Sequence, residues 1–176
     1  IDQLLSYGPA HFSVYILTIK NEFAFSVNIP NEDYIAEEYE RVSNYLCSKG
    51  FQHYEVSNFA LPGRESRHNL KYWQTESVAA IGPSATGLMV GEDKAKRYKW
   101  KTEAPDFIVE DLGVDELKIE RLYMALRSHI GVEPNHFFHK EDIAKFNVMC
   151  EKWVNQGLVR IEFPRVYATA KGYLVL

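Results

Sequence analysis

The pattern of apolar and polar positions predicts a chain that begins with alternating strands and helices. Residues 12–19 are rich in β-branched and aromatic side chains, and they predict a strand. Asn31 is suited to cap a helix that Gly50 would end, and residues 51–59 predict a second strand. The apolar positions of that helix recur at helical spacing: Ile35, Tyr39, Val42 and Leu46. Strand, helix and strand with short connections is the sequence form of a βαβ unit.

The next part of the chain contains two loops that we expect to lie close together. Leu61-Pro62-Gly63 ends the second strand, residues 68–76 predict a short helix or turn, and residues 82–87 form a loop of small residues. In a parallel α/β architecture, the loops that follow the strands lie at the carboxyl ends, where ligands bind. We therefore expect residues 60–73 and 82–87 to share one rim.

The second part of the chain predicts two helices and a hairpin. Glu103-Ala104-Pro105 is typical of a boundary and divides the chain into residues 1–102 and 103–176. A helix is expected from Asp115 or Glu116 to Gly131, a second over residues 143–156, and a hairpin follows over residues 158–169. This order resembles a winged-helix-like module.

Composition narrows the class of protein. The 176 residues carry a net charge of −4, with a pI near 5.9, which disfavours a dedicated nucleic-acid-binding protein. No apolar run approaches the roughly 18 residues that cross a bilayer. Cys47 and Cys150 make neither a disulfide framework nor a metal-spaced pair, which favours a reduced, cytoplasmic setting. Because the first residue is Ile1, we expect the chain to be a segment of a longer protein.

The residues with the richest chemistry lie between positions 54 and 73. His68 carries an imidazole that can bind a metal or haem iron, although a lone histidine more often serves as a hydrogen-bonding residue. Tyr72 and Trp73 can stack on a planar ring, and their spacing fits core aromatics equally well. The polar residues at the end of the second predicted strand suit either a ligand site or a turn: Glu55, Ser57 and Asn58.

Other candidate sites are weaker. The basic run from Lys94 to Lys101 is interleaved with Tyr98 and Trp100, and it can attract carboxylate or phosphate groups or be solvated surface. The loop at residues 82–87 lacks the lysine of a phosphate-binding P-loop. His136 and His139 lie three residues apart, but no third metal ligand accompanies them.

Two runs of residues carry a family resemblance. They are Tyr54-Glu55-Val56-Ser57-Asn58-Phe59-Ala60 and, after Pro62-Gly63, Glu65-Ser66-Arg67-His68-Asn69-Leu70-Lys71-Tyr72-Trp73. Together they resemble the radical S-adenosylmethionine (SAM) family of oxygen-independent coproporphyrinogen III oxidases, and within it the branch of HemW-type haem chaperones. His-Asn-x-x-Tyr-Trp is the motif of that branch. The resemblance extends over the whole chain, as roughly the C-terminal half of a family member.

The resemblance implies an α/β fold, the C-terminal part of a partial (β/α) barrel followed by a small winged-helix-like domain. It implies haem handling by His68, with its imidazole on the iron, and by Asn69, Tyr72 and Trp73. It places Ala60 and Thr86 where the family approaches SAM. The three-cysteine motif that binds the family's 4Fe–4S cluster is absent, so we expect the segment alone to be inactive as an oxidoreductase.

Two departures from the branch are visible. Ser84-Ala85-Thr86 stands where Gly-Ala-His or a similar sequence is usual, and the asparagine that often follows Arg-Tyr is missing after Tyr98. Three functions follow as hypotheses: haem binding and transfer to an unknown acceptor protein, part of a coproporphyrinogen III oxidase, or a winged-helix nucleic-acid-binding module. The first is the leading interpretation, with no nucleic-acid partner expected.

Overall fold

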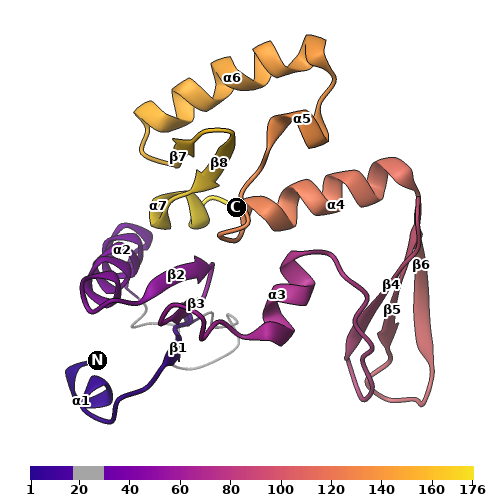
Figure 1. Cartoon of the computed structure of the whole chain (residues 1–176). Coiled ribbons are helices and arrows are strands. Elements are labelled where there is room, and N and C mark those ends of the chain that lie inside the picture. Colours follow the sequence, from indigo (N-terminus) through magenta and orange to yellow (C-terminus); the bar gives the residue numbers. More distant parts are fainter. Residues whose placement is uncertain (18–29) are drawn as a thin grey trace.

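The computed structural model describes residues 1–17 and 30–176 of the chain. Within them, helices combine with three small antiparallel sheets, so the expectation of a mixed α/β fold is confirmed. Figure 1 shows a first sheet beside the N-terminus, a second sheet at the opposite end of the molecule, and a helical part with a short hairpin above them. Helix α3 (Arg67–Trp73) lies between the two larger sheets.

The first sheet is built by the N-terminal third of the chain. Helix α1 (Asp2–Leu5) precedes strand β1 (His11–Ser13), and helix α2 (Glu32–Ser48) precedes strands β2 (Gln52–Glu55) and β3 (Asn58–Ala60). The predicted cap of α2 is confirmed, because the Asn31 side chain accepts a hydrogen bond from the Tyr34 amide at 2.8 Å. Gly50, at φ +90°, follows the helix as expected.

The prediction of one strand over residues 51–59 was wrong, because β2 and β3 form an antiparallel hairpin. Strand β3 lies between β1 and β2 and pairs with both in antiparallel fashion. The predicted strand over residues 12–19 is shorter in its described part, with residues 14–17 outside β1 and residues 18 and 19 outside the described ranges. The parallel βαβ pairing on which the shared rim was argued is therefore not present in the described residues.

The second sheet comprises β4 (Thr86–Val90), β5 (Ala95–Trp100) and β6 (Phe107–Leu112), paired in that order. Tyr98 lies opposite Gly87, and its ring crosses the glycine so closely that an added Cβ would clash with the ring. The ring reaches beyond β4 to Ala80, whose amide donates to the Tyr98 hydroxyl at 2.8 Å. Gly87 is thus required where an aromatic side chain packs across the strand.

The sequence cue for a boundary at Glu103-Ala104-Pro105 lies in the turn between β5 and β6. Strand β6, which belongs to the second predicted domain, pairs along its whole length with β5 of the first. Leu112 at its end packs with Leu117 of the following helix. The division into residues 1–102 and 103–176 stays a prediction, and the second sheet spans it.

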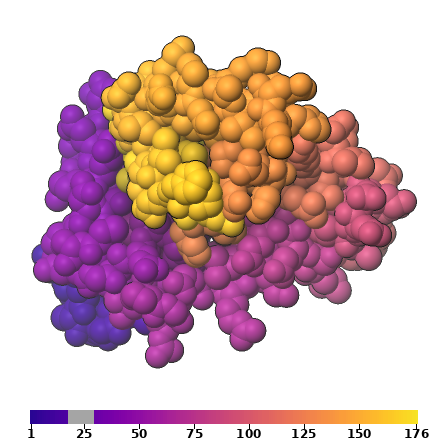
Figure 2. Space-filling model, turned by 45° about the horizontal axis from the view of Figure 1, so that its top comes forward, coloured from indigo at the N-terminus to yellow at the C-terminus, as the bar shows by residue number. Residues whose placement is uncertain are grey.

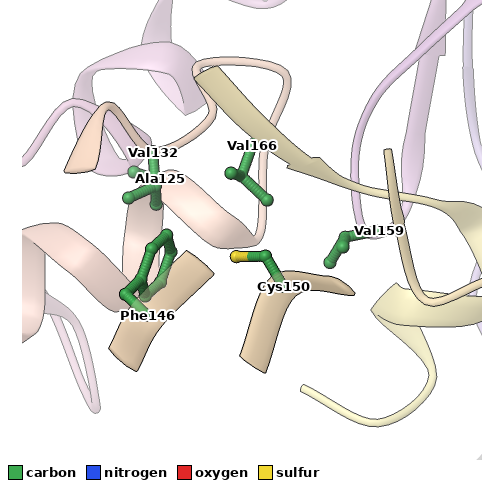
Figure 3. Packing of buried hydrophobic residues seen from close by; sticks show 6 residues of the cluster. All are labelled: Ala125, Val132, Phe146, Cys150, Val159 and Val166. Carbon is green, nitrogen blue, oxygen red and sulfur yellow. The ribbon is translucent and has the colours of Figure 1, made fainter. Parts of the chain in front are cut away.

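The C-terminal part contains helices α4 (Val114–Leu126), α5 (Pro134–Phe137) and α6 (Lys140–Asn155), then strands β7 (Val159–Glu162) and β8 (Arg165–Ala168) and helix α7 (Ala170–Tyr173). The predicted helices and hairpin are present, but α4 ends before the expected Gly131. The core of this part gathers side chains from α4, the segment after α4, α6 and the hairpin around the Cys150 sulfur (Figure 3): Ala125, Val132, Phe146, Val159 and Val166.

The C-terminal part packs directly on the first sheet and its helix. Tyr173 of α7 is buried with Tyr39 of α2, and the His129 amide donates to the Tyr54 carbonyl at 2.7 Å. Figure 2 shows the yellow C-terminal residues seated against both the purple N-terminal part and the orange helices. None of the helices in the described residues is apolar over a length that would cross a bilayer.

Candidate functional site

The His-Asn-Leu-Lys-Tyr-Trp run forms most of helix α3, which begins with a serine cap. The Ser66 hydroxyl accepts a hydrogen bond from the Asn69 amide at 3.3 Å, which satisfies one of the free amides of the first turn. A seven-residue helix is too short to be stable alone, so its position depends on the cap and on contacts with its surroundings. The expectation of a short helix here is confirmed.

His68 and Tyr72 share the outward face of α3. They are four residues apart, which places them one above the other, and their rings meet edge to face with centroids 5.1 Å apart. His68 is exposed, whereas Tyr72 is half-buried and its hydroxyl donates to the Thr86 carbonyl at 3.4 Å. The imidazole is therefore accessible and steadied by an aromatic ring that is itself tied to β4.

Asn69 and Trp73 lie about 100° further round the helix and face the rest of the protein. Asn69 is half-buried, and its backbone amide donates to the Ser66 cap. Trp73 is half-buried, and the Arg127 guanidinium lies over its ring at 5.9 Å from the centroid. The motif thus divides into two residues that present chemistry outward and two that fix the helix in place.

Tyr54 is the centre of the support beneath α3. It is the extra residue of a bulge in β2, where His53 pairs with Phe59 and Glu55 with Asn58, so that two successive side chains are buried. Its hydroxyl contacts His11 Nε2 at 2.8 Å and accepts from the Ser66 amide at 3.3 Å. Burial raises the pKa of Tyr54, and the hydroxyl remains neutral at ordinary pH.

Glu55 is a buried carboxyl group beside this tyrosine. It accepts from the Asn58 side-chain amide and, at 3.2 Å, from the Ser57 amide, while the Ser13 hydroxyl donates to the Asn58 carbonyl oxygen. Burial raises the pKa of Glu55, and these hydrogen bonds oppose the rise. Glu55, Ser57 and Asn58 thus have partners within the hairpin, which supports the turn interpretation of these residues.

A strained turn ends α3. Thr75 adopts φ +55°, a left-handed conformation that is unfavourable for a β-branched residue. It is buried, and its hydroxyl has no hydrogen-bonding partner among the described residues. Strain of this kind typically costs about 1–3 kcal/mol and is maintained only by surrounding structure. Here it directs the chain from Trp73 toward the second sheet.

The two residues expected near SAM lie in different sheets. Ala60 is fully buried in β3, between His11 and Gln52 of the neighbouring strands. Thr86 begins β4 and is half-buried, with its carbonyl bound to Tyr72. The structure therefore brings Thr86, but not Ala60, into contact with the α3 motif, and a role in SAM binding stays a prediction for both.

The basic run forms β5 and is largely paired with acidic side chains. Arg97 contacts Glu110 at 2.7 Å and Glu120 at 2.6 Å, and Lys96 lies 3.5 Å from Asp111. The strand alternation sends Tyr98 and Trp100 to the face opposite Arg97. Solvated surface is thus the better interpretation of most of the run's charges.

The residues present do not fit an iron–sulfur cluster. Cys47 is exposed and Cys150 is buried in the C-terminal core, both as free thiols. The described ranges contain no group of three His, Cys, Asp or Glu side chains that would hold a metal ion, and His136 instead lies 3.6 Å from Glu133. The described residues therefore offer no ligand set for such a cluster.

Sequence reasoning missed Tyr54 and Arg127 as parts of the site. Tyr54 belongs to the resemblance, but its burial depends on a bulge that sequence periodicity does not reveal. Arg127 follows α4, more than fifty residues after Trp73, and only the folded chain brings them together. Strand β5, in contrast, could have been predicted from the sequence. Its side chains alternate between two faces, with Lys96, Tyr98 and Trp100 on one and Arg97 and Lys99 on the other.

Comparison with known proteins places this arrangement in a family context. No protein-family model matches the chain. It is 29% identical to the haem chaperone HemW of Lactococcus lactis over 98% of its own length and 50% of that protein's. It is 29% identical to mouse radical S-adenosyl methionine domain-containing protein 1, mitochondrial, over 100% of its length and 46% of the relative's. The chain thus spans about half the length of these curated relatives.

A solved structure confirms the fold. The coproporphyrinogen III oxidase HemN from Escherichia coli, a radical SAM enzyme, aligns with 99% of this chain and 48% of its own, at a TM-score of 0.64 and 14% identity. At that identity the likeness concerns the fold alone. The sequence matches to HemW proteins extend along nearly the whole chain, so the chain is similar to about half of a radical SAM protein of the HemW type.

Proposed function

We propose that this chain is the tetrapyrrole-handling part of a haem chaperone, with His68 as the residue that meets haem iron. The proposal is supported chiefly by similarity to proteins named haem chaperone HemW, at 29% and 28% identity over 98% and 99% of the chain. The exposed imidazole of His68 next to the Tyr72 ring is compatible with it. A neutral imidazole nitrogen is a common ligand of haem iron.

The neighbouring side chains suit the remaining parts of haem. Lys71 lies one helical turn from His68 and is half exposed, 3.6 Å from Glu76, so its ammonium group can turn to a propionate. Tyr72 offers a ring edge and face beside the iron ligand. Asn69 and Trp73 act indirectly in this proposal, because the Asn69 amide binds the Ser66 cap and the Trp73 ring packs against Arg127.

The longer protein would supply the rest of the chemistry. SAM and a 4Fe–4S cluster belong to the proposal only for a full-length member, because this chain lacks the three cysteines of the cluster motif. The enzymatic alternative, coproporphyrinogen oxidation, has support only from a fold likeness, which does not fix function. The haem-accepting partner and a cytoplasmic location remain proposals, the second supported by the two free thiols.

A titration with ferric haem tests the role of His68. The 176-residue chain is expected to shift the Soret band on binding, and His68→Ala should remove most of that shift and weaken binding by about tenfold, since a ligand bond is lost. His136→Ala is a matched control, because His136 is another exposed histidine on a short helix. An identical Soret spectrum and affinity in His68→Ala would exclude His68 as the iron ligand.

A further inference from the structure

The outer face of the second sheet is hollowed into a groove that the proposed iron ligand does not line. The groove has a volume of about 540 Å³, within the range of roughly 300–1,000 Å³ that is typical of small-molecule sites. Its wall is almost wholly apolar, with one cation at the rim. It is lined by Ala79, Ala80, Ile81, Met89, Lys96, Tyr98, Trp100, Phe107 and Val109.

The aromatic wall of the groove is fixed in place before any ligand arrives. The Trp100 indole donates to the Ala80 carbonyl at 2.8 Å, and the Ala80 amide donates to the Tyr98 hydroxyl at 2.8 Å. Phe107 meets both rings edge to face, with centroids 5.5 Å from Trp100 and 5.9 Å from Tyr98. A preorganised wall of this kind binds a rigid flat ligand without losing side-chain entropy.

The apolar residues at the mouth of the groove are unusually exposed. Ile81 is 89% exposed, Met89 63% and Val109 47%. All three line the same groove, whose apolar wall is of the sort that marks an interaction site. Lys96 stands at the same face, 60% exposed, with its ammonium only 3.5 Å from Asp111.

The groove's chemistry selects a particular kind of ligand. Stacking and edge contacts from three rings favour a flat, apolar ring system, and one accessible ammonium favours an anionic group at the ligand's edge. A nucleotide is disfavoured, because an aqueous triphosphate would meet an apolar wall with a single cation. A tetrapyrrole with carboxylate side chains combines the required features.

We propose that the groove on the outer face of β4–β5–β6 binds the macrocycle of a tetrapyrrole carboxylate, with Lys96 at a carboxylate and Tyr98, Trp100 and Phe107 against the ring. The choice of a tetrapyrrole rests on the proposed function, whereas the flat, anionic character of the ligand rests on the groove. Binding in the groove requires no iron, because the aromatic side chains contact the macrocycle and not the metal. It therefore differs in kind from ligation by His68.

Iron-free protoporphyrin IX is the probe that separates the two sites, and β6 supplies a matched pair of variants. Val109 faces the groove, whereas its neighbour Ile108 points to the opposite face of the same strand and is 63% exposed. Val109→Glu should weaken porphyrin binding by about tenfold or more, because a carboxylate is placed in an apolar wall beside an anionic ligand. Ile108→Glu should bind porphyrin like the parent chain.

The measurement is porphyrin fluorescence during titration with each chain, with circular dichroism as the check on folding. Met89→Glu is a second groove variant for the case in which Val109→Glu fails to fold. Equal porphyrin affinity in the parent, Ile108→Glu and both groove variants would overturn the proposal. So would a parent chain that sediments as a dimer and becomes monomeric in Val109→Glu without binding porphyrin, because a second copy would then cover the face.

Failure of the groove and failure of the proposed function give different results. If haem binds in a His68-dependent way but iron-free porphyrin does not bind, the groove proposal is wrong and the chaperone proposal stands. If iron-free porphyrin binds in a Val109-dependent way but the haem spectrum is unchanged in His68→Ala, the groove proposal stands and His68 is not the ligand.

Discussion

His53 is a histidine enclosed by other rings. It stacks on Phe59 with centroids 4.0 Å apart, meets Tyr173 edge to face at 5.0 Å, and its Nδ1 lies 2.9 Å from the Ser43 hydroxyl. Burial lowers the pKa of His53 from 6.5 to about 4. The ring is therefore neutral in the folded protein at ordinary pH, which suits a packing residue and not a proton donor.

This lowered pKa predicts a loss of stability in mild acid. The unfolded chain takes up a proton near pH 6.5 while the folded chain does not until about pH 4, so stability is present above pH 6.5 and lost as pH falls toward 4. Between pH 7 and pH 5 the loss is about 2 kcal/mol from this residue. Urea unfolding of the parent chain and His53→Gln at both pH values measures it.

The difference in stability between the parent chain and His53→Gln isolates the contribution of His53. His53→Gln should be less stable than the parent at pH 7, because ring contacts are lost, and the gap should narrow by about 2 kcal/mol at pH 5. Glu55 titrates in both chains, so its contribution cancels in the difference. A gap that is the same at the two pH values would show that folding does not lower the pKa of His53.

At the scale of elements, α3 depends on its cap more than longer helices do. Ser66→Ala removes the acceptor of the Asn69 amide and should lower the free energy of unfolding by about 1 kcal/mol. Because α3 has only seven residues, we expect it to fray and haem affinity to fall by up to about fivefold, although His68 is intact. Urea unfolding and a haem titration measure the two effects.

Asn31→Ala is the control for this prediction. Asn31 makes the equivalent bond to the Tyr34 amide at the start of α2, a helix of 17 residues. It should lower stability by a similar amount and leave haem affinity unchanged. Equal haem affinity in Ser66→Ala and Asn31→Ala would mean that the shape of α3 does not matter for binding.

The same comparison of elements shows what the sequence can and cannot predict. The α2 cap at Asn31 and the glycine after α6 are local signals, and both elements form as predicted, with Gly157 at φ +74°. The hairpin between β2 and β3 was missed because its turn, Val56-Ser57, contains neither glycine nor proline and is held instead by the Glu55 side chain. Local patterns do not encode such a contact.

The site was predictable to a similar extent. The short helix follows from the sequence, and it is present with His68 exposed on it. The inward role of Trp73 depends on Arg127, and the burial of Tyr54 depends on a bulge, so both required the folded chain. Pro105 lies in the turn of the β5–β6 hairpin, and because a proline-containing turn looks the same between domains as within a hairpin, the boundary there stays a prediction.

At the scale of the molecule, the first sheet and the C-terminal part share buried surface. Ser128 is fully buried, and its backbone pairs with Glu55 in an isolated antiparallel β-bridge. Tyr54 is fully buried beneath α3. Tyr173 contributes a buried ring next to Tyr39 and His53. Burial raises the pKa of the Tyr173 hydroxyl, which stays neutral. The Glu55–Ser128 and Tyr39–Tyr173 contacts join segments that are more than seventy positions apart, so separating the two parts would expose buried side chains of both.

This shared core predicts that the chain unfolds as one unit. Tyr173→Ala removes a buried ring and should lower stability by about 3 kcal/mol, which corresponds to roughly 6–12 °C in Tm for a chain of this size. Calorimetry should give one transition in both chains, because loss of Tyr173 weakens α2 and the first sheet together with α7. Val175→Ala, at a residue 68% exposed, is the control and should leave Tm nearly unchanged. Two transitions, of which only one moves in Tyr173→Ala, would instead show that residues 1–102 and 103–176 fold independently, as the Pro105 cue suggested.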